Sequence, residues 1–240
     1  KYMVNINNVY QTVLVITNKD NRGYITPDEF NRLAEQAQNE IFASYFAKQA
    51  SYELNAFVDS DFSDPTTYLA EKINVFYKSG DLTLSNGVFT YPSDLYRVGV
   101  ISVDNKVADR ASHEEIKYIN LSPLTYPVAT QPVYTLGDTG VTVYPDTVTT
   151  GVKADYLKKP IRPKWGYVLQ GTVPYYDPTV FDPATDSYDT AAKSYNFELH
   201  PSEENNLVIR ILTYAGVVIK QGDVTGFSQS KEQQNAATEQ

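Results

Sequence analysis

Residues 18–29 have residue types and spacing that could bind calcium. Six of them fit positions one, three, five, six, eight and twelve of an EF-hand loop: Asn18, Asp20, Arg22, Gly23, Ile25 and Glu29. Two of the six argue against a metal, because Arg22 is a cation and Asn18 replaces the usual first aspartate. A helix start explains the same stretch, since Thr26 and Glu29 match a capping box. We favour the helix start and keep a calcium-responsive binding module as the alternative.

A second acidic stretch lies further along the chain, in residues 177–189. Four aspartates are spread over it: Asp177, Asp182, Asp186 and Asp189. Carboxylates bind hard cations such as Ca²⁺, but Asp, Pro, Ser and Thr are also the ordinary residues of turns. We interpret the stretch as a solvated turn, and we predict neither a metal ion nor a cofactor for the chain.

Nucleophilic and acid–base catalysis lack the residues that they usually need. The chain has no cysteine, two histidines and no Gly-x-Ser-x-Gly run. Each histidine has a local explanation, because His113 lies in a predicted helix start and His200 directly precedes a proline. We therefore predict that the protein is not an enzyme and has no catalytic residue.

One basic cluster occupies residues 158–164, where four cations occur in seven residues: Lys158, Lys159, Arg162 and Lys164. The cluster could contact a nucleic-acid backbone or a phosphorylated partner. We favour contact with an acidic surface on a neighbouring subunit, because a self-associating chain of net charge −9 must balance its own charge. Trp165 follows the cluster directly, and tryptophan is a frequent interface anchor.

Composition limits the classes of protein to which the chain could belong. Its 240 residues are 42% hydrophobic and 20% charged, which suits folded domains with a core and excludes a disordered chain. No apolar run approaches the ~20 residues of a membrane span, and the first residues do not match a secretory signal. The net charge of −9 disfavours nucleic-acid binding, whereas 20 tyrosines suit extensive protein interfaces.

Helical spacing and helix-start signals dominate the first third of the chain. They predict a helix over residues 6–16, a longer helix that begins after Thr26, and a third helix over residues 65–77. A last helix is expected near the other end, with Ser202 as its cap.

The hydrophobic period changes to two residues from residue 80 onward. Short strands are expected at residues 81–84, 88–91, 96–103, 133–136, 141–144, 152–157 and 196–199. The first two are joined by Asn86–Gly87, which predicts a tight hairpin turn. Ser112 and Glu115 form a second capping-box pattern and predict a brief helix between strands.

The expected fold class is α+β, with three parts in one integrated structural unit. These are an N-terminal helical bundle (residues 1–79), a central antiparallel β-sheet or sandwich (80–199), and a C-terminal part (200–240). The central part includes a Pro- and aromatic-rich arm at about residues 160–190. The C-terminal helix is expected to pack back on the N-terminal helices, because neither group alone makes a deep core.

Three stretches, taken in order, resemble one family of viral proteins. They are residues 18–38 (NKDNRGYITPDEFNRLAEQAQ), 155–167 (DYLKKPIRPKWGY) and 197–212 (FELHPSEENNLVIRIL). Together they are similar to head-to-tail connector and tail ring (adaptor) proteins of tailed bacteriophages, especially of the crAss-like podoviruses of gut Bacteroidales.

The resemblance implies a structural virion protein without a catalytic residue. Such a protein would form a homo-oligomeric ring, commonly of twelve copies, between the portal protein and adjacent tail ring or hub proteins. The ring would line the channel through which genomic DNA passes without sequence-specific binding, and a negative surface would let the DNA slide. The implied location is the neck or tail of the virion, assembled in the bacterial host cytoplasm without a membrane.

Ring contacts of the head-to-tail kind need two different patches on each subunit, and aromatic side chains can supply both. The candidate interface combines the basic cluster with the aromatic residues of the arm: Lys158, Lys159, Arg162, Lys164, Trp165, Tyr167, Tyr175, Tyr176 and Phe181. An adhesive or carbohydrate-binding β domain is a competing hypothesis based on the same aromatic residues. The predicted N-terminal helices argue against it.

Overall fold

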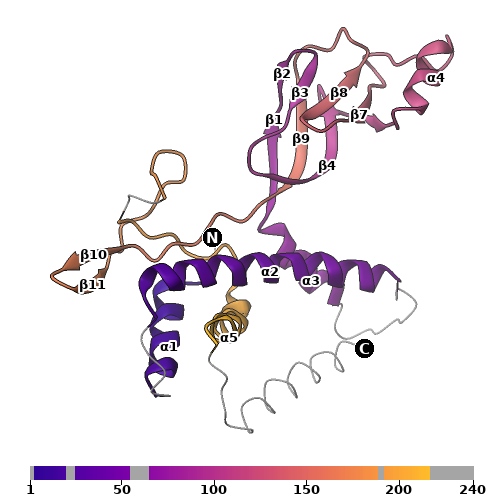
Figure 1. The fold of residues 1–240 in the computed structure, drawn as a ribbon. Helices are drawn as coiled ribbons and strands as arrows, with labels where there is room; N and C mark the ends of the chain where they lie inside the picture. Colours follow the sequence, from indigo (N-terminus) through magenta and orange to yellow (C-terminus); the bar gives the residue numbers. More distant parts are fainter. Residues whose placement is uncertain (1–2, 20–24, 55–64, 189–191, 217–240) are drawn as a thin grey trace. The chain divides into compact units, whose positions relative to one another are not determined.

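The computed structural model describes residues 3–19, 25–54, 65–188 and 192–216 and divides the chain into two compact units. The helical unit comprises residues 1–75 and 160–240, and the sheet unit is the segment 76–159 between them (Figure 1). The predicted α+β class is confirmed, with helices towards both ends of the chain and sheets in the middle.

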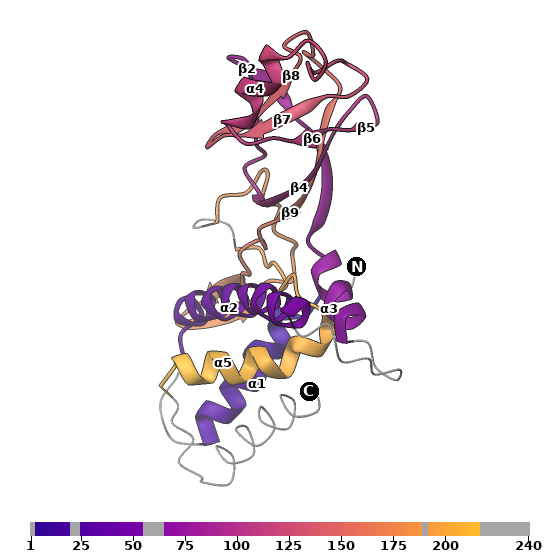
Figure 2. The same cartoon turned by 90° about the vertical axis from the view of Figure 1, so that its right-hand side faces the viewer.

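Four α-helices form the framework of the described part of the helical unit: α1 (Ile6–Lys19), α2 (Pro27–Leu54), α3 (Pro65–Asn74) and α5 (Glu204–Tyr214). Their buried side chains recur at helical spacing, as Val9 and Val13 show in α1 and Leu207 and Ile211 in α5. Helix α5 packs against both α1 and α2 (Figures 1 and 2). The predicted return of the C-terminal helix onto the N-terminal helices is therefore confirmed.

The start of α5 differs from the prediction. A short 3-10 turn, η1 (Pro201–Glu203), precedes the helix, and Nδ1 of His200 accepts a hydrogen bond from the Ser202 N–H at 3.3 Å. His200 thus caps the 3-10 turn, and the N-cap position of α5 is Glu203 and not Ser202. The strand expected at residues 196–199 is a single bridge, in which the Phe197 N–H donates to the Val4 carbonyl at 3.1 Å.

The sheet unit is built from two packed sheets. One has the strand order β1-β9-β4-β5, formed by β1 (Tyr77–Asp81), β9 (Val152–Lys158), β4 (Leu95–Val103) and β5 (Lys106–Val107). The other has the order β2-β3-β8-β7-β6, formed by β2 (Thr83–Ser85), β3 (Val88–Thr90), β8 (Gly140–Tyr144), β7 (Val133–Leu136) and β6 (Asp109–Arg110). Neighbouring strands are antiparallel except for β6 and β7, which are parallel and joined through helix α4 (Glu115–Leu121).

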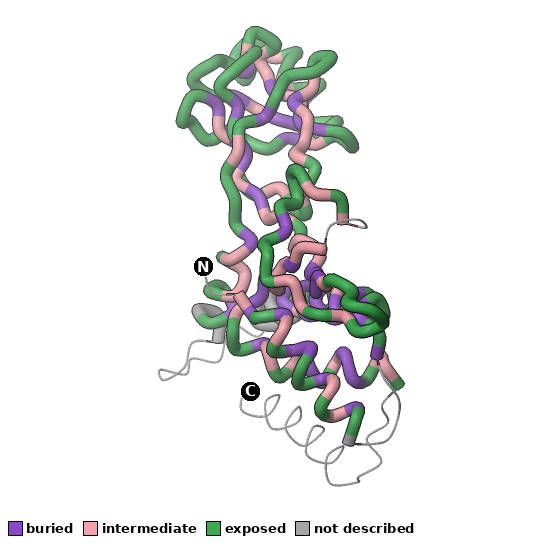
Figure 3. Tube along the Cα trace, turned by 90° about the vertical axis from the view of Figure 1, so that its left-hand side faces the viewer, coloured by how far each residue is buried: buried purple, intermediate pink, exposed green. Residues whose placement is uncertain are grey.

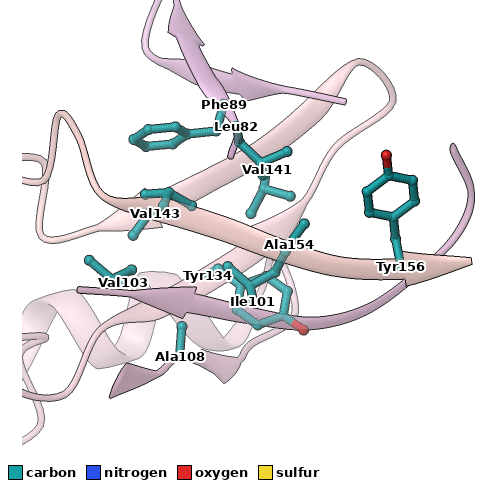
Figure 4. Close-up of a cluster of buried hydrophobic side chains, with 11 residues drawn as sticks. Leu82, Phe89, Ile101, Val103, Ala108, Tyr134, Val141, Val143, Ala154 and Tyr156 are labelled. Carbon is teal, nitrogen blue, oxygen red and sulfur yellow. The ribbon is translucent and has the colours of Figure 1, made fainter. Parts of the chain in front are cut away.

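The core of the sheet unit lies between these two sheets. Ile101 and Ala154 from one sheet and Phe89, Val141 and Val143 from the other are all buried in it (Figure 4). Along β9 buried residues alternate with more exposed ones, as a strand with one covered face requires. Figure 3 colours the described chain by burial and shows buried, intermediate and exposed positions in both units.

Most of the predicted strands are present, and the hairpin turn at Asn86–Gly87 is confirmed. Both residues have positive φ, 53° and 80°, which a two-residue turn of this hand needs. Strand β1 was missed, because residues 65–77 were assigned to one helix and β1 is almost wholly exposed and shows no buried alternation. It pairs with β9 from Tyr77 opposite Leu157 onward.

The two ends of the sheet unit are hydrogen-bonded neighbours. The Lys158 N–H donates to the Phe76 carbonyl at 2.9 Å, directly beyond the paired residues of β1 and β9. Segment 76–159 is therefore closed on itself, as an inserted domain is. This division differs from the expected one at residues 79 and 199, because strand β1 begins at Tyr77 and the arm from residue 160 belongs to the helical unit.

Candidate functional site

The described end of the EF-hand-like stretch is a helix start. Oε2 of Glu29 accepts hydrogen bonds from the Thr26 N–H at 3.0 Å and from Oγ1 of Thr26 at 2.7 Å. These bonds, the backbone one first, lower the pKa of the Glu29 carboxyl. The carboxylate at loop position twelve is thus engaged in the predicted capping box, and residues 20–24 of the loop lie outside the described residues.

The acidic stretch uses its carboxylates to hold its own turns. Oδ1 of Asp177 accepts from the Thr179 N–H at 2.9 Å, and Oδ2 of Asp186 accepts from the Asp182 N–H at 2.8 Å. Asp186 also pairs with Lys193 at 2.9 Å, and Asp189 lies outside the described residues. Within the four described ranges, no three His, Asp or Glu side chains are grouped so that they could hold a metal ion.

Trp165 lies in the interior of the helical unit. Its side chain is 2% exposed, and its ring centroid is 4.3 Å from that of Tyr10, 5.8 Å from Tyr167 and 5.7 Å from Tyr176. Its indole Nε1 donates to Oδ1 of Asn7 at 3.0 Å. The tryptophan therefore joins the arm to the helices of its own chain.

Two side-chain amides on α2 fasten the arm to that helix. Asn31 accepts from the Trp165 N–H at 2.7 Å and donates to the Trp165 carbonyl at 3.2 Å. Two helical turns later, Gln38 donates to the Ile161 carbonyl at 2.8 Å and accepts from the Glu198 N–H at 3.0 Å. Both amides are buried, so they take the place of a neighbouring strand for the arm's backbone.

The basic cluster is largely balanced within the chain. Arg162 pairs with Glu35 at 2.5 Å and lies 3.8 Å from the ring centre of Tyr188. Lys164 is buried, and its Nζ donates to the Tyr188 carbonyl. Phe181 is buried as well. Lys164, Trp165 and Phe181 are therefore interior residues of the helical unit and do not face solvent, in contrast to the interface predicted for them.

The other predicted interface residues retain exposed surface. Lys159 and Tyr175 are exposed, whereas Lys158, Arg162, Tyr167 and Tyr176 are half-buried. For these six residues an interface role stays a prediction. Lys158 and Lys159 belong to the sheet unit and the other seven residues to the helical unit.

The sequence-based interpretation missed two exposed apolar surfaces. The first, called the hairpin surface, consists of Val168, Leu169, Val173 and Tyr175 on strands β10 (Tyr167–Gln170) and β11 (Val173–Tyr176). All four side chains are exposed, and Leu169 is 60% exposed. The two strands pair with each other and with no other described strand, so the hairpin is a separate two-stranded sheet.

The second surface, called the 118–128 surface, lies on the sheet unit at the end of α4 and in the loop that follows. It consists of Tyr118, Leu121, Leu124, Tyr126 and Val128. Three of these side chains are among the most exposed apolar groups of the described chain, at 74%, 80% and 94% for Tyr118, Leu121 and Leu124. Nine of the eighteen exposed large apolar residues among those described lie on these two surfaces.

Both surfaces coincide with runs of sequence that carry no charge. Residues 118–137 contain no Asp, Glu, Lys, Arg or His, and neither do residues 165–176. One residue in five of the whole chain is charged, so a gap of twenty residues departs clearly from the average. The absence of charge is the sequence signal that could have identified the surfaces.

A hollow of about 590 Å³ lies beside the hairpin surface and has a cationic character. Arg32, Arg162 and Lys164 line it with Val168 and Leu169, against one lining carboxylate. That carboxylate, Asp28, accepts a hydrogen bond from the Tyr167 hydroxyl at 3.4 Å. The exposed cation of the hollow is Arg32, which lies in the second turn of α2.

Comparison with protein-family models gives no match for this chain, and comparison with curated proteins gives none either. Among the helices that the structure describes, none combines the length and apolar character needed to cross a bilayer.

Proposed function

We propose that the protein is a structural virion protein that forms a ring in the head-to-tail connector or tail of a bacteriophage. The ring, of about twelve copies by family resemblance, would join the portal protein to adjacent tail proteins and line the genome channel. One observation carries the ring: each chain exposes two different apolar, charge-free surfaces, one on each unit.

Exposed apolar surface of this kind calls for a partner. Single exposed apolar residues are ordinary on a protein surface, whereas contiguous groups mark interaction sites. Here five large apolar side chains lie exposed within eleven consecutive residues, and four more lie on one hairpin. A closed ring buries one surface of each kind at every contact, so no copy keeps either exposed.

The distribution of charge is compatible with a genome channel. Residues 76–159 carry eight cations and nine anions, so the sheet unit has a net charge of only −1. The remaining −8 belongs to the helical unit. We assign the channel lining to the helical unit, because a negative wall repels the phosphate backbone and lets DNA slide. The family resemblance of residues 18–38, 155–167 and 197–212 supports the phage setting.

A calcium-responsive module built on residues 18–29 has less support. A bidentate Glu at position twelve is central to an EF-hand site, and Glu29 already accepts two hydrogen bonds from Thr26.

The proposal is tested by imaging the oligomeric state of the full chain. We expect cryo-electron microscopy of concentrated protein, alone and with its portal and tail partners, to show closed rings of a single copy number. Monomers under both conditions would overturn the proposal. Calorimetry with CaCl₂ and with a chelator separates the alternative, which requires a heat of binding that the ring does not.

A further inference from the structure

We infer that the 118–128 surface of one copy docks head to tail on the hairpin surface of the next copy. This inference rests on the proposed ring and goes beyond it, because it names the two surfaces that meet at each contact. Neither surface lies in the three stretches that carry the family resemblance. The inference therefore depends only on the geometry, burial and charge of the two surfaces.

The 118–128 surface is held in shape before any partner binds. Ile116 is buried and anchors α4, and the capping box of Ser112 and Glu115 fixes its start, with the Ser112 N–H donating to Oε2 of Glu115 at 2.8 Å. The loop after α4 is closed by the Thr125 N–H, which donates to the Ser122 carbonyl at 3.2 Å, and by the Gln131 N–H, which donates to the Val128 carbonyl at 2.9 Å. A preformed surface binds without a large ordering cost.

The topology leaves this apolar segment uncovered. Parallel strands need a crossover connection, and here that connection runs from β6 through α4 to β7. A crossover helix usually covers its sheet with an apolar face, yet α4 buries only Ile116. Tyr118 and Leu121, three residues apart on α4, are directed to solvent together with Leu124.

The hairpin has one face fixed and one face open. Residues directly opposite in the pairing share a face, so Tyr167 and Tyr176 share one face, and both rings pack on Trp165. Val168 and Tyr175 form the opposite pair, and Val173 lies on their face two residues along. All three are exposed, so the hairpin presents an apolar face on a base held by the interior tryptophan.

Charge selects a head-to-tail contact over a contact between like surfaces. The residues just before the 118–128 surface, exposed Glu114, Glu115 and Lys117, carry a net charge of −1, and exposed Arg32 lies in the cationic hollow beside the hairpin surface. Two 118–128 surfaces facing each other would bring together two rims of net negative charge, and two hairpins would bring two cationic hollows together. Docking the two different surfaces places opposite charges at the rim of an uncharged centre.

The absence of cysteine makes the contact directly testable by disulfide trapping. We expect the double variant Leu124→Cys, Val173→Cys to give, under mild oxidation, a ladder of covalent oligomers on a non-reducing gel, because Val173 lies on the open face of the hairpin. Mixing the single variants Leu124→Cys and Val173→Cys should give mainly a mixed disulfide dimer. Neither single variant alone should cross-link as efficiently, because each would require a contact between like surfaces.

Two matched pairs control for random collision. Val107 on β5 is an exposed apolar residue of the sheet unit, and Ile209 on α5 is one of the helical unit. Val107→Cys with Val173→Cys, and Leu124→Cys with Ile209→Cys, should give no ladder. A ladder as strong from these controls, or a cross-link within single chains only, would overturn the inference.

A charge reversal tests the rim independently. We expect Glu114→Arg and Arg32→Glu each to weaken assembly about tenfold or more at low salt, and the double variant to recover most of the loss. Rings that form normally while the trapping and the rescue both fail would refute this contact but leave the ring intact. Failure of the wild-type chain to form rings at all would refute the proposed function instead.

Discussion

The two units of this protein reach stability by different routes. The sheet unit is one continuous segment whose buried side chains, such as Ile101 and Val141, meet between two sheets (Figure 4). The helical unit is assembled from two distant parts of the chain, and polar side chains do much of the joining. The Ile6 N–H, for example, donates to Oδ1 of Asn196, 190 residues away. An arm without regular structure can therefore be as firmly placed as a strand when buried amides pair its backbone.

The same comparison bears on assembly. Each unit has its own buried core and still leaves an apolar surface exposed. This is the 118–128 surface on the sheet unit and the hairpin surface on the helical unit. In neither case is the exposed group needed to fill the core of its own unit. A subunit that assembles through two different surfaces needs such exposed apolar side chains.

The largest effect is expected from removing the central ring of the helical unit. Trp165→Ala should lower the free energy of unfolding of that unit by about 4 kcal/mol, because the side chain is buried among Tyr10, Tyr167 and Tyr176. The measurement is urea unfolding followed by circular dichroism, with amide NMR to assign the loss. If the folded-state amide signals of the sheet unit disappear at the same urea concentration, the two units do not unfold separately.

A matched change in the sheet unit should act on the other half of the comparison. Ile101→Ala removes a fully buried side chain and should cost about 3 kcal/mol in the sheet unit. The only tryptophan of the chain, Trp165, reports on the helical unit. Its fluorescence transition should keep its midpoint while circular dichroism shows an earlier one, and a shared shift of both signals would contradict two separate units.

A smaller effect is expected from the amide pairing that sets the helical unit apart. Gln38→Met keeps the volume but leaves the Ile161 carbonyl and the Glu198 N–H without this partner, at a cost of about 2 kcal/mol. The control is Gln36→Met, at an exposed position on the same helix. If the unfolding transitions of Gln38→Met and Gln36→Met, followed by tryptophan fluorescence, have equal midpoints, the Gln38 amide does not stabilise the helical unit.

The smallest effect concerns the two capping boxes, one in each unit. Hydrogen bonds from the backbone and side chain of Thr26 and of Ser112 lower the pKa of Glu29 and Glu115, respectively. A carboxyl whose pKa is lowered by folding stabilises the folded state above its ordinary value of 4.5, and the gain is lost as the pH falls through the lowered value.

Stability should therefore decline less steeply between pH 5 and pH 3 in Glu29→Gln than in the wild type, because the variant has no titrating group at this position. Glu115→Gln should show the same change in the sheet unit only. Unfolding midpoints over this pH range, followed by fluorescence and by circular dichroism, provide the measurement. Parallel pH profiles for variant and wild type would show that the capping bonds do not favour the charged carboxylates.

The sequence predicted local structure well wherever a local signal was present. Thr26 and Glu29, Ser112 and Glu115, and the turn at Asn86–Gly87 all act as their types suggest. Apolar spacing likewise identified α1, α2 and α5. These features depend on neighbours within a few residues, so no knowledge of the remaining fold is needed to find them.

Long-range placement could not be predicted in the same way. The sequence predicts Trp165 and Phe181 as interface residues, because no local pattern shows that Tyr10 or Tyr188 would cover them. Strands β1 and β10 are mostly exposed and lack the alternation that reveals a strand, and the alternating strand β11 carries a proline, which argues against a strand in the sequence. The two candidate surfaces have a visible signal in their missing charges, but only the exposure of Leu121, Leu124 and Leu169 in the folded structure shows that these apolar residues are not core.

The central claim is that the exposed apolar surfaces exist to assemble the chain into a ring. Native mass spectrometry of the wild type beside the double variant Leu121→Asp, Leu124→Asp tests it most directly, with circular dichroism to show that the variant is folded. The account predicts one closed oligomer for the wild type and a folded monomer for the variant. The same mass for both proteins, whether ring or monomer, would contradict it.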